Sequence, residues 1–555
     1  MSEERSCGIL MHITSLPSKH GIGTLGAESY KFVDFLKKAG QRYWQILPIG
    51  PTGYGDSPYQ CYSAYAGNPL LIDIDMLIED GLVSPDDQDL MIIDKKENFA
   101  DYAQLFSFKN VILQKAYTRF TAEGAAEEKL AFDKFCRKNA YWLDDYALFM
   151  SLKYHFKLKM WTQWDEDIIM RKPDSVKKYT AKLSEEIKCQ KFMQYIFFKQ
   201  YKALKKYANK NGIKIFGDMP IYVSMDSADV WASPELFCLD DKKRPTAVAG
   251  CPPDYFSPTG QLWGNPLYNW DKMEKDGYKW WISRIKYSSR LFDITRIDHF
   301  RGFESYYAIP AGSETAEHGK WLKGPSNKLF EAVKAKLGDV PLIAEDLGFL
   351  TDDVRRMLKK AGYPGMNVLE FAFSADRENS SYLPHNYIEN SVVYIGTHDN
   401  QTATGWYASL DEKTRKFVNK YLDIREGDSP AWKLIAAAYM SVSRTAIIQM
   451  QDFLEIGDEG RMNIPSTVGG GNWAWRMEEG CLSKKLAKRI RKLAKLYFRT
   501  KPKVKKPKKD KEDTAAEQEE AVLPEAKEDG TAPVLTESIT EEDTQDIAET
   551  ETETE

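Results

Sequence analysis

Six polar or charged side chains lie at the ends of short apolar segments whose alternation is typical of β-strands. They are Asp218, Arg296, Asp298, Glu345, His398 and Asp399. Charged residues are rarely buried without a partner, so each such strand end indicates either a salt-bridged surface edge or the floor of an active site. The segment around Asp298 fits both interpretations equally well by itself. Several acids at matched strand ends favour an active site.

Two carboxylates on either side of a glycosidic bond are the groups that glycoside chemistry requires. Asp298 lies two residues after Arg296, and a nearby cation lowers a carboxylate pKa, which suits an ionised nucleophile. Glu345 follows the apolar pair Ile343-Ala344, where desolvation would raise its pKa and make it the better acid. We assign no chemical role to His299 and interpret it as a packed histidine at the strand end.

The segments that carry these residues alternate with helical patterns. The predicted strands lie near residues 9, 46, 215, 295, 343, 369, 394 and 447. Eight strands alternating with helices predict a closed (β/α)₈ barrel, in which the active site lies at the carboxyl ends of the strands. An open doubly wound sheet is the alternative, but it would need a glycine-rich phosphate loop after its first strand, and this sequence has none.

Two segments interrupt the alternation, and a third follows it. Residues from about 67 to 180 predict a helical insertion after the second strand, and residues from about 224 to 271 predict a loop-rich, aromatic insertion after the third. We therefore expect a catalytic domain over residues 1–500. Residues 501–555 contain eight Lys against 18 Asp plus Glu and no aromatic residue, which predicts a disordered charged tail.

The composition excludes several classes of protein. The 555 residues contain no apolar run of about 18 residues, so we expect no membrane span, and the polar N-terminus lacks the pattern of a signal peptide. Seven scattered cysteines without a CxxC pair favour a reducing compartment, by default the cytoplasm, and exclude a zinc site of that type. A formal net charge of −5 gives no reason to expect a nucleic-acid partner.

Several motifs resemble those of a known family. Arg296–Gly302, Ala344–Gly348 and Gly396–Asn400 resemble the fourth-, fifth- and seventh-strand motifs of the α-amylase superfamily, in the forms found in glycoside hydrolase family 77, the 4-α-glucanotransferases. Six further segments also resemble motifs of that family. They are Gly55–Gln60, Gly217–Ile221, Pro253–Ser257, Gly260–Pro266, Arg461–Pro465 and Gly471–Arg476. The resemblance spans about residues 6–497 and implies the same barrel fold.

The resemblance also implies a role for each matched residue. Asp298 would be the nucleophile, Glu345 the general acid and base, and Asp399 the residue that holds the sugar hydroxyls in the transition state. The residues lining the subsite of the attacked glucose would be Tyr59, Asp218, Arg296 and His398, and those stacking on glucan rings would be Tyr54 and Trp263. Gln401 departs from the family, which usually has an acid there, but it lies outside the matched catalytic residues.

The activity implied is the transfer of a 1,4-α-glucan segment to the 4-hydroxyl of an acceptor, by a retaining double displacement. The partners would be malto-oligosaccharides and other 1,4-α-glucans, and no cofactor or metal is expected. An α-amylase-like hydrolase uses the same residues and is the alternative, and a catalytically inactive glucan-binding protein is a more distant one. The sequence leaves donor length, cyclic products, oligomeric state and the role of the tail open.

Overall fold

The computed structural model describes residues 4–53, 55–90, 98–253, 257–348, 350–373 and 380–501. Its centre is a parallel sheet in the order β10-β11-β12-β1-β2-β3-β6-β9. The strands are β1 (Ser6–Leu10), β2 (Tyr43–Gln45), β3 (Lys214–Met219), β6 (Ile294–Ile297), β9 (Leu342–Ala344), β10 (Gly365–Val368), β11 (Ser391–Tyr394) and β12 (Thr445–Gln449). The two end strands meet, since the Ala344 amide donates to the Pro364 carbonyl oxygen at 2.9 Å. The predicted eight-stranded barrel is therefore confirmed.

A glycine allows the close approach of three neighbouring barrel strands. A Cβ on Gly8 of β1 would lie 2.6 Å from the Cβ of Tyr43 in β2 and 2.7 Å from Cδ1 of Ile447 in β12. Real Cβ atoms do not approach this closely, so only glycine fits between the two neighbouring strands.

Helices alternate with the strands as predicted. They are α1 (Ala27–Ala39), α7 (Ser184–Lys210), α10 (Lys279–Leu291), α11 (Asn327–Leu337), α12 (Asp352–Ala361), α13 (Ala403–Ser409), α14 (Glu412–Leu422), α15 (Pro430–Met440), α16 (Met450–Leu454) and α17 (Lys484–Leu496). Local sequence sets their ends: the Thr351 hydroxyl accepts from the Val354 amide at the start of α12. Gly40 takes a left-handed φ of 74° at the end of α1.

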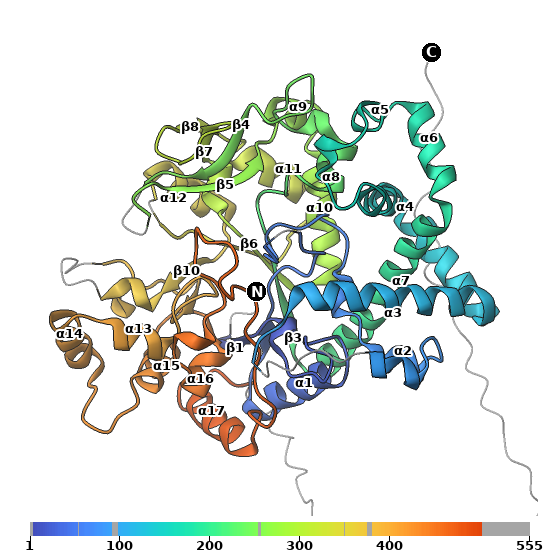
Figure 1. The fold of residues 1–555 in the computed structure, drawn as a ribbon. Coiled ribbons are helices and arrows are strands. Elements are labelled where there is room, and N and C mark those ends of the chain that lie inside the picture. The colour runs from blue at the N-terminus through green and yellow to red at the C-terminus, as the bar shows by residue number, and fades with distance from the viewer. Residues whose placement is uncertain are drawn as a thin grey trace, which may run out of the picture. The chain divides into compact units, whose positions relative to one another are not determined.

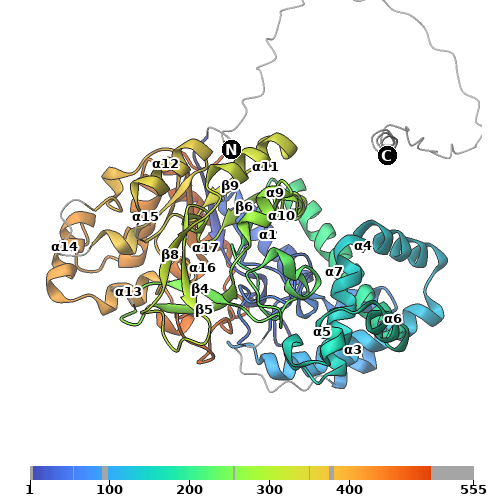
Figure 2. The ribbon, with the colours of Figure 1, turned by 90° about the horizontal axis from the view of Figure 1, so that it is seen from above.

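The insertion after the second strand is helical, as expected. It contains α2 (Ile74–Glu79), α3 (Tyr102–Glu123), α4 (Ala126–His155), α5 (Glu166–Ile169) and α6 (Pro173–Lys182). In both views α3 to α7 lie on one side of the molecule and α12 to α15 on the other (Figures 1 and 2). Within the described residues, no helix combines the length and apolar character that a bilayer crossing requires.

The prediction of loops over residues 224–271 is wrong in part. This segment contains α8 (Ala228–Ala232), β4 (Ala247–Cys251) and β5 (Gln261–Pro266), and α9 (Trp270–Lys275) begins at its end. The two strands join β7 (Ser305–Pro310) and β8 (Lys320–Lys323) in an antiparallel sheet of order β5-β4-β7-β8. Figure 1 shows these four strands together, apart from the barrel strands β1 and β3. We refer to them as the small sheet.

The sixth barrel strand, β10, is shorter than expected. The mostly apolar segment Met366–Phe373 predicts one strand near residue 369, but β10 ends at Val368 and a 3₁₀ turn, Leu369–Ala372, follows. Leu369 and Ala372 are both fully buried in this turn, so their apolar character does not distinguish strand from turn. The predicted tail over residues 501–555 lies outside the described residues beyond Lys501, and its disorder and the domain division stay predictions.

Arg499 connects several segments at the bottom of the barrel, where the strands begin. Its side chain is fully buried and donates hydrogen bonds to six backbone carbonyl oxygens at 2.7 to 3.3 Å. The acceptors are Ser6, Ala438, Tyr439, Ser441, Ser443 and Arg444. Arg499 therefore joins the start of β1, the end of α15 and the start of β12.

Candidate active site

The carboxyl ends of neighbouring barrel strands bring the predicted polar residues together. Asp218 of β3 is the register partner of Arg296 in β6, and Ile297 of β6 is the partner of Ala344 in β9. Asp298 and Glu345 directly follow these last two residues, so the parallel register places them next to each other at one edge. The loop after β11 supplies His398 and Asp399.

Arg296 connects two of the carboxylates. Its Nη1 lies 2.7 Å from Oδ2 of Asp218, and its Nη2 lies 2.8 Å from Oδ1 of Asp298. The Tyr59 hydroxyl donates to the same Asp218 oxygen at 2.8 Å. The side chains of Arg296 and Asp218 are buried, whereas 28% of the Asp298 side chain is exposed. Asp298 is thus held by an ion pair and still reaches solvent at the mouth of the barrel.

Burial and neighbouring charge set the proton affinities of the two central acids. Burial, and then the charge of Asp298, raise the pKa of Glu345 to about 7, although the amides of His299 and Leu347 donate to it at 2.7 and 2.8 Å. Burial also raises the pKa of Asp298, and Arg296 opposes this rise. The expected raised pKa of Glu345 is found, whereas Arg296 offsets the burial of Asp298 only in part.

Asp399 is held by two residues that had no assigned role in the sequence. Nδ2 of Asn463 donates to Oδ1 of Asp399 at 2.7 Å, and Nη2 of Arg461 donates to its backbone carbonyl oxygen at 2.7 Å. His398 Nε2 lies 3.4 Å from Oδ2 of Asp399. The only signal in the sequence was the motif Arg461–Pro465, which resembles a family motif but does not show what its side chains contact.

We expect Asn463→Ala to lower kcat by about 10- to 100-fold, because a hydrogen bond to a charged group contributes about 1.5–3 kcal/mol. Steady-state transfer kinetics, with thermal unfolding recorded in parallel, measure this effect. Asn419→Ala is the matched control, since Asn419 also makes one side-chain hydrogen bond, to Tyr407 at 2.7 Å, but on the surface helix α14. A wild-type kcat for Asn463→Ala would show that Asp399 is positioned without it.

Three aromatic rings form a wall beside these acids. Tyr59 stacks on His398 with a centroid distance of 5.0 Å and an interplanar angle of 13°. Trp473 lies 5.8 Å from Tyr59 and 5.9 Å from His398. The structure therefore brings the predicted Tyr59 and His398 together, and it adds Trp473, which was predicted only as part of a motif. Such a wall suits the apolar face of a sugar ring.

Trp263, predicted to stack on glucan rings, lies on β5 of the small sheet. Its ring meets the ring of His299 edge to face at 4.8 Å. His299 has a left-handed φ of 49°, and burial lowers its pKa to about 3, so its ring is neutral. Since its amide also donates to Glu345, His299 links Trp263 to the predicted acid. Tyr54 lies outside the described residues.

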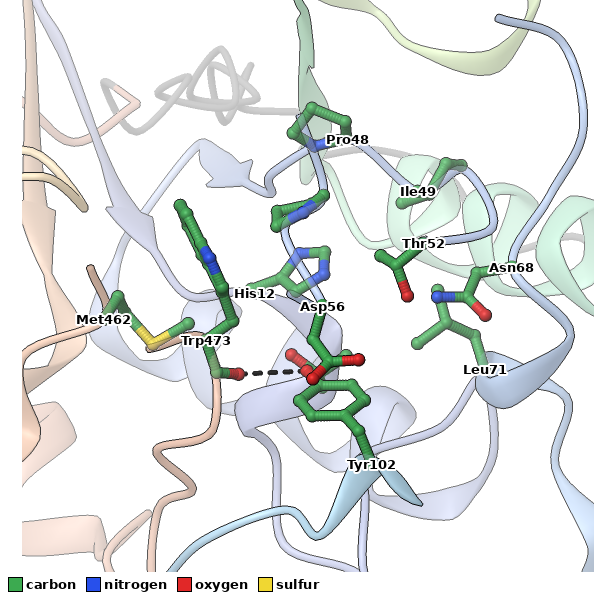
Figure 3. Close-up of a pocket in the computed structure, with 12 residues that line it drawn as sticks. His12, Pro48, Ile49, Thr52, Asp56, Asn68, Leu71, Tyr102, Met462 and Trp473 are labelled. Atoms are coloured by element: carbon green, nitrogen blue, oxygen red, sulfur yellow. Dashed lines mark hydrogen bonds between the residues drawn. The ribbon is translucent and has the colours of Figure 1, made fainter. Parts of the chain in front are cut away.

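A small cavity next to Trp473 is shown in Figure 3. It is lined by His12, Thr14, Pro48, Ile49, Thr52, Asp56, Pro58, Asn68, Leu71, Tyr102, Met462 and Trp473. The Tyr102 hydroxyl donates to the Trp473 carbonyl oxygen at 3.0 Å, the dashed line in the figure. The cavity volume of about 10 Å³ is near what one water molecule needs, so the cavity is too small for a sugar. The hydrogen bond from Tyr102 holds the backbone of Trp473 in place.

No cluster of three or more His, Cys, Asp or Glu suited to a metal ion occurs in the part of the chain that the structure describes. The carboxylates at the barrel mouth instead pair with Arg296 and with amide donors. The arrangement provides an ion-paired carboxylate, a second acid with a raised pKa, and an aromatic wall. These are the groups for acid- and nucleophile-assisted cleavage of a glycosidic bond.

Comparison with known proteins agrees with this chemistry. The family model described as 4-alpha-glucanotransferase matches residues 11–483. A 4-alpha-glucanotransferase of Clostridium butyricum is 48% identical over 491 residues, which cover 88% of this chain and 100% of that protein. One of Thermus thermophilus is 46% identical over 501 residues, covering 89% and 99%.

A solved structure supports the same conclusion. An amylomaltase from Streptococcus agalactiae, in complex with acarbose, superposes with a TM-score of 0.87 at 44% identity and covers 90% of this chain and 100% of its own. An amylomaltase from Corynebacterium glutamicum, at 18% identity and a TM-score of 0.70, shares the fold. The chain therefore belongs to the 4-alpha-glucanotransferase family and is an enzyme of that type.

Proposed function

We propose that the enzyme moves a segment of a 1,4-α-D-glucan to the 4-hydroxyl of an acceptor glucan or glucose by a retaining double displacement. The observation that carries this proposal is the pairing of Asp298, bound to Arg296 at 2.8 Å, with Glu345, whose pKa is raised to about 7. The ion pair with Arg296 favours the ionised form of Asp298, and Glu345 keeps a proton near neutral pH.

In the first step a carboxylate oxygen of Asp298 attacks the anomeric carbon of the donor. The bond from that carbon to the leaving glucan oxygen breaks, and Glu345 gives its proton to this oxygen. The product is a glucosyl ester of Asp298 with β configuration. Asp399 binds hydroxyls of the attacked glucose as its ring flattens. Tyr59, Asp218, Arg296 and His398 line the subsite of this glucose.

In the second step the ionised Glu345 takes the proton from the 4-hydroxyl of an acceptor. The acceptor oxygen attacks the anomeric carbon, and the bond to Asp298 breaks, which restores the α configuration. Water in place of the acceptor would give hydrolysis. We propose that Trp263 and Tyr54 stack on acceptor rings and exclude water, which favours transfer.

Malto-oligosaccharides and other 1,4-α-glucans are the proposed substrates, and the acarbose complex of the relative from Streptococcus agalactiae supports a site for such sugars. The proposed compartment is the cytoplasm. All seven cysteines are free, which suits a reducing environment.

Incubation with maltotriose tests the function directly. Transfer is expected to produce free glucose together with a ladder of glucans longer than maltotriose, separated by chromatography. The enzyme without donor and the Asp298→Asn variant with donor are the blanks. Products that are all shorter than maltotriose would instead indicate an α-amylase-like hydrolase, and no product at all would indicate a glucan-binding protein.

A further inference from the structure

Trp321 is a partly exposed tryptophan to which the proposed site assigns no role. The chain has 14 Trp, all within the described residues, and Trp321 alone is among the exposed large apolar side chains, with 41% of its surface accessible. It lies in β8, the outer strand of the small sheet. An indole that is partly exposed and held in a fixed orientation offers a flat apolar face on which a ligand ring can stack.

Two neighbours hold the Trp321 ring in place. The guanidinium carbon of Arg301 lies 4.0 Å from the ring centroid, a cation–π contact, and the Arg301 side chain is itself buried. Tyr307, the register partner of Trp321 on β7, packs against it at a centroid distance of 5.3 Å and an angle of 60°. The indole is therefore supported by buried groups while part of it faces solvent, which reduces the entropy lost on binding.

The contact with Arg301 places the Trp321 indole on the side of the cleft that carries Glu345, the predicted general acid. Arg301 lies in the 3₁₀ turn Phe300–Phe303, three residues after Asp298. Phe300, the first residue of this turn, donates its amide to the Glu345 carbonyl oxygen at 3.0 Å. Because Glu345 is proposed to protonate the leaving glucan and deprotonate the acceptor, a surface near it serves the leaving and acceptor side of the cleft. The small sheet that carries Trp321 also carries Trp263.

We propose that Trp321 is a stacking platform for a distal glucose ring of a long linear 1,4-α-glucan on the leaving and acceptor side. The apolar face of a glucose ring matches a fixed, partly exposed indole in size and flatness. Charged side chains flank it, with Lys323 bound to Glu304 and Asp353. One indole with a charged rim is too small for a stable protein interface, which needs about 1,000 Å². This inference rests on the proposed transfer function.

Trp321→Ala is expected to lower the ratio of kcat/KM for long amylose to kcat/KM for maltotriose by about three- to tenfold. Trp321→Phe keeps a flat ring and is expected to restore most of that ratio. Phe498→Ala is the matched control, because Phe498 is an aromatic residue with 82% exposure next to the buried Arg499 at the bottom of the barrel. It is expected to leave the ratio at the wild-type value.

A binding measurement separates this inference from the proposed function. Asp298→Asn protein, with and without Trp321→Ala, is compared for retardation by amylose in native gels. Weaker retardation of the double variant supports the platform even if no transfer is observed. Equal retardation together with an unchanged kcat/KM ratio overturns it. A change of the Trp321→Ala protein to a smaller species in size-exclusion chromatography would also overturn it, since the surface would then join two copies of the chain.

Discussion

Asp298→Asn is expected to abolish transfer, with a loss in kcat/KM on the order of 10⁴-fold or more. The amide has the shape of the carboxyl group but cannot form the covalent glucosyl intermediate. Arg296 keeps its second partner, Asp218, at 2.7 Å, so the rest of the site is expected to stay in place. Transfer from maltotriose, followed by chromatography, measures the loss.

The same variant is expected to unfold at a temperature no lower than that of the wild type. Burial raises the pKa of Asp298 above that of the unfolded chain, so its ionised form costs stability at pH values above the unfolded pKa, and the neutral amide removes this cost. Asp423→Asn is the control, since Asp423 is exposed and pairs with Arg425 at 3.0 Å on the surface. Near-wild-type transfer by the Asp298→Asn enzyme would exclude Asp298 as the nucleophile.

Glu345→Gln is expected to lower kcat with glucan donors by about 10²- to 10⁴-fold, the usual contribution of a general acid. With α-glucosyl fluoride as donor, the loss in the first step is expected to be small, since fluoride leaves without a proton. Glu274→Gln, which changes an exposed acid paired with Lys328 at 2.6 Å, is the matched control. An equal loss with both donors would contradict a role for Glu345 in protonating the leaving group.

Glu345 also determines the expected pH dependence. The first step needs Glu345 protonated, and burial raises its pKa to about 7, so kcat/KM with glucan donors is expected to fall as the pH rises above about 7. In the Glu345→Gln variant this alkaline decline is expected to disappear. A profile recorded from pH 5 to 9 with both enzymes checks the assignment, and an unchanged alkaline limb in the variant would assign the decline to another group.

The barrel and its polar strand ends could be predicted from the sequence because both are local signals. Alternating apolar residues followed by Asp298 or Glu345 identify a strand and its functional end within a few positions. The small sheet could not be predicted in this way. Its strands β4 and β7 pair Gly250 with Tyr307, far apart in sequence, and the glycine- and proline-rich connection hides their alternation.

Contacts between loops that are far apart in the sequence could not be predicted either. Asn463 lies 64 positions from Asp399, and no local pattern shows that its amide reaches that carboxylate at 2.7 Å. The effect of Arg296 on Asp298 also depends on three-dimensional structure. Adjacency in sequence predicts a lowered pKa, but Asp218 shares the guanidinium and burial acts in the opposite direction.

The closure of the barrel bottom has a consequence for biosynthesis. Ser6 of β1 pairs with Thr445 of β12, 439 positions later, and Arg499 then bonds to the Ser6 carbonyl oxygen. At about 5–20 residues per second, the ribosome needs on the order of tens of seconds to supply these partners. During that time one edge of β1 has no strand beside it, and an unpaired apolar edge is prone to aggregate. Expression yield should therefore depend on protection of this nascent N-terminal strand.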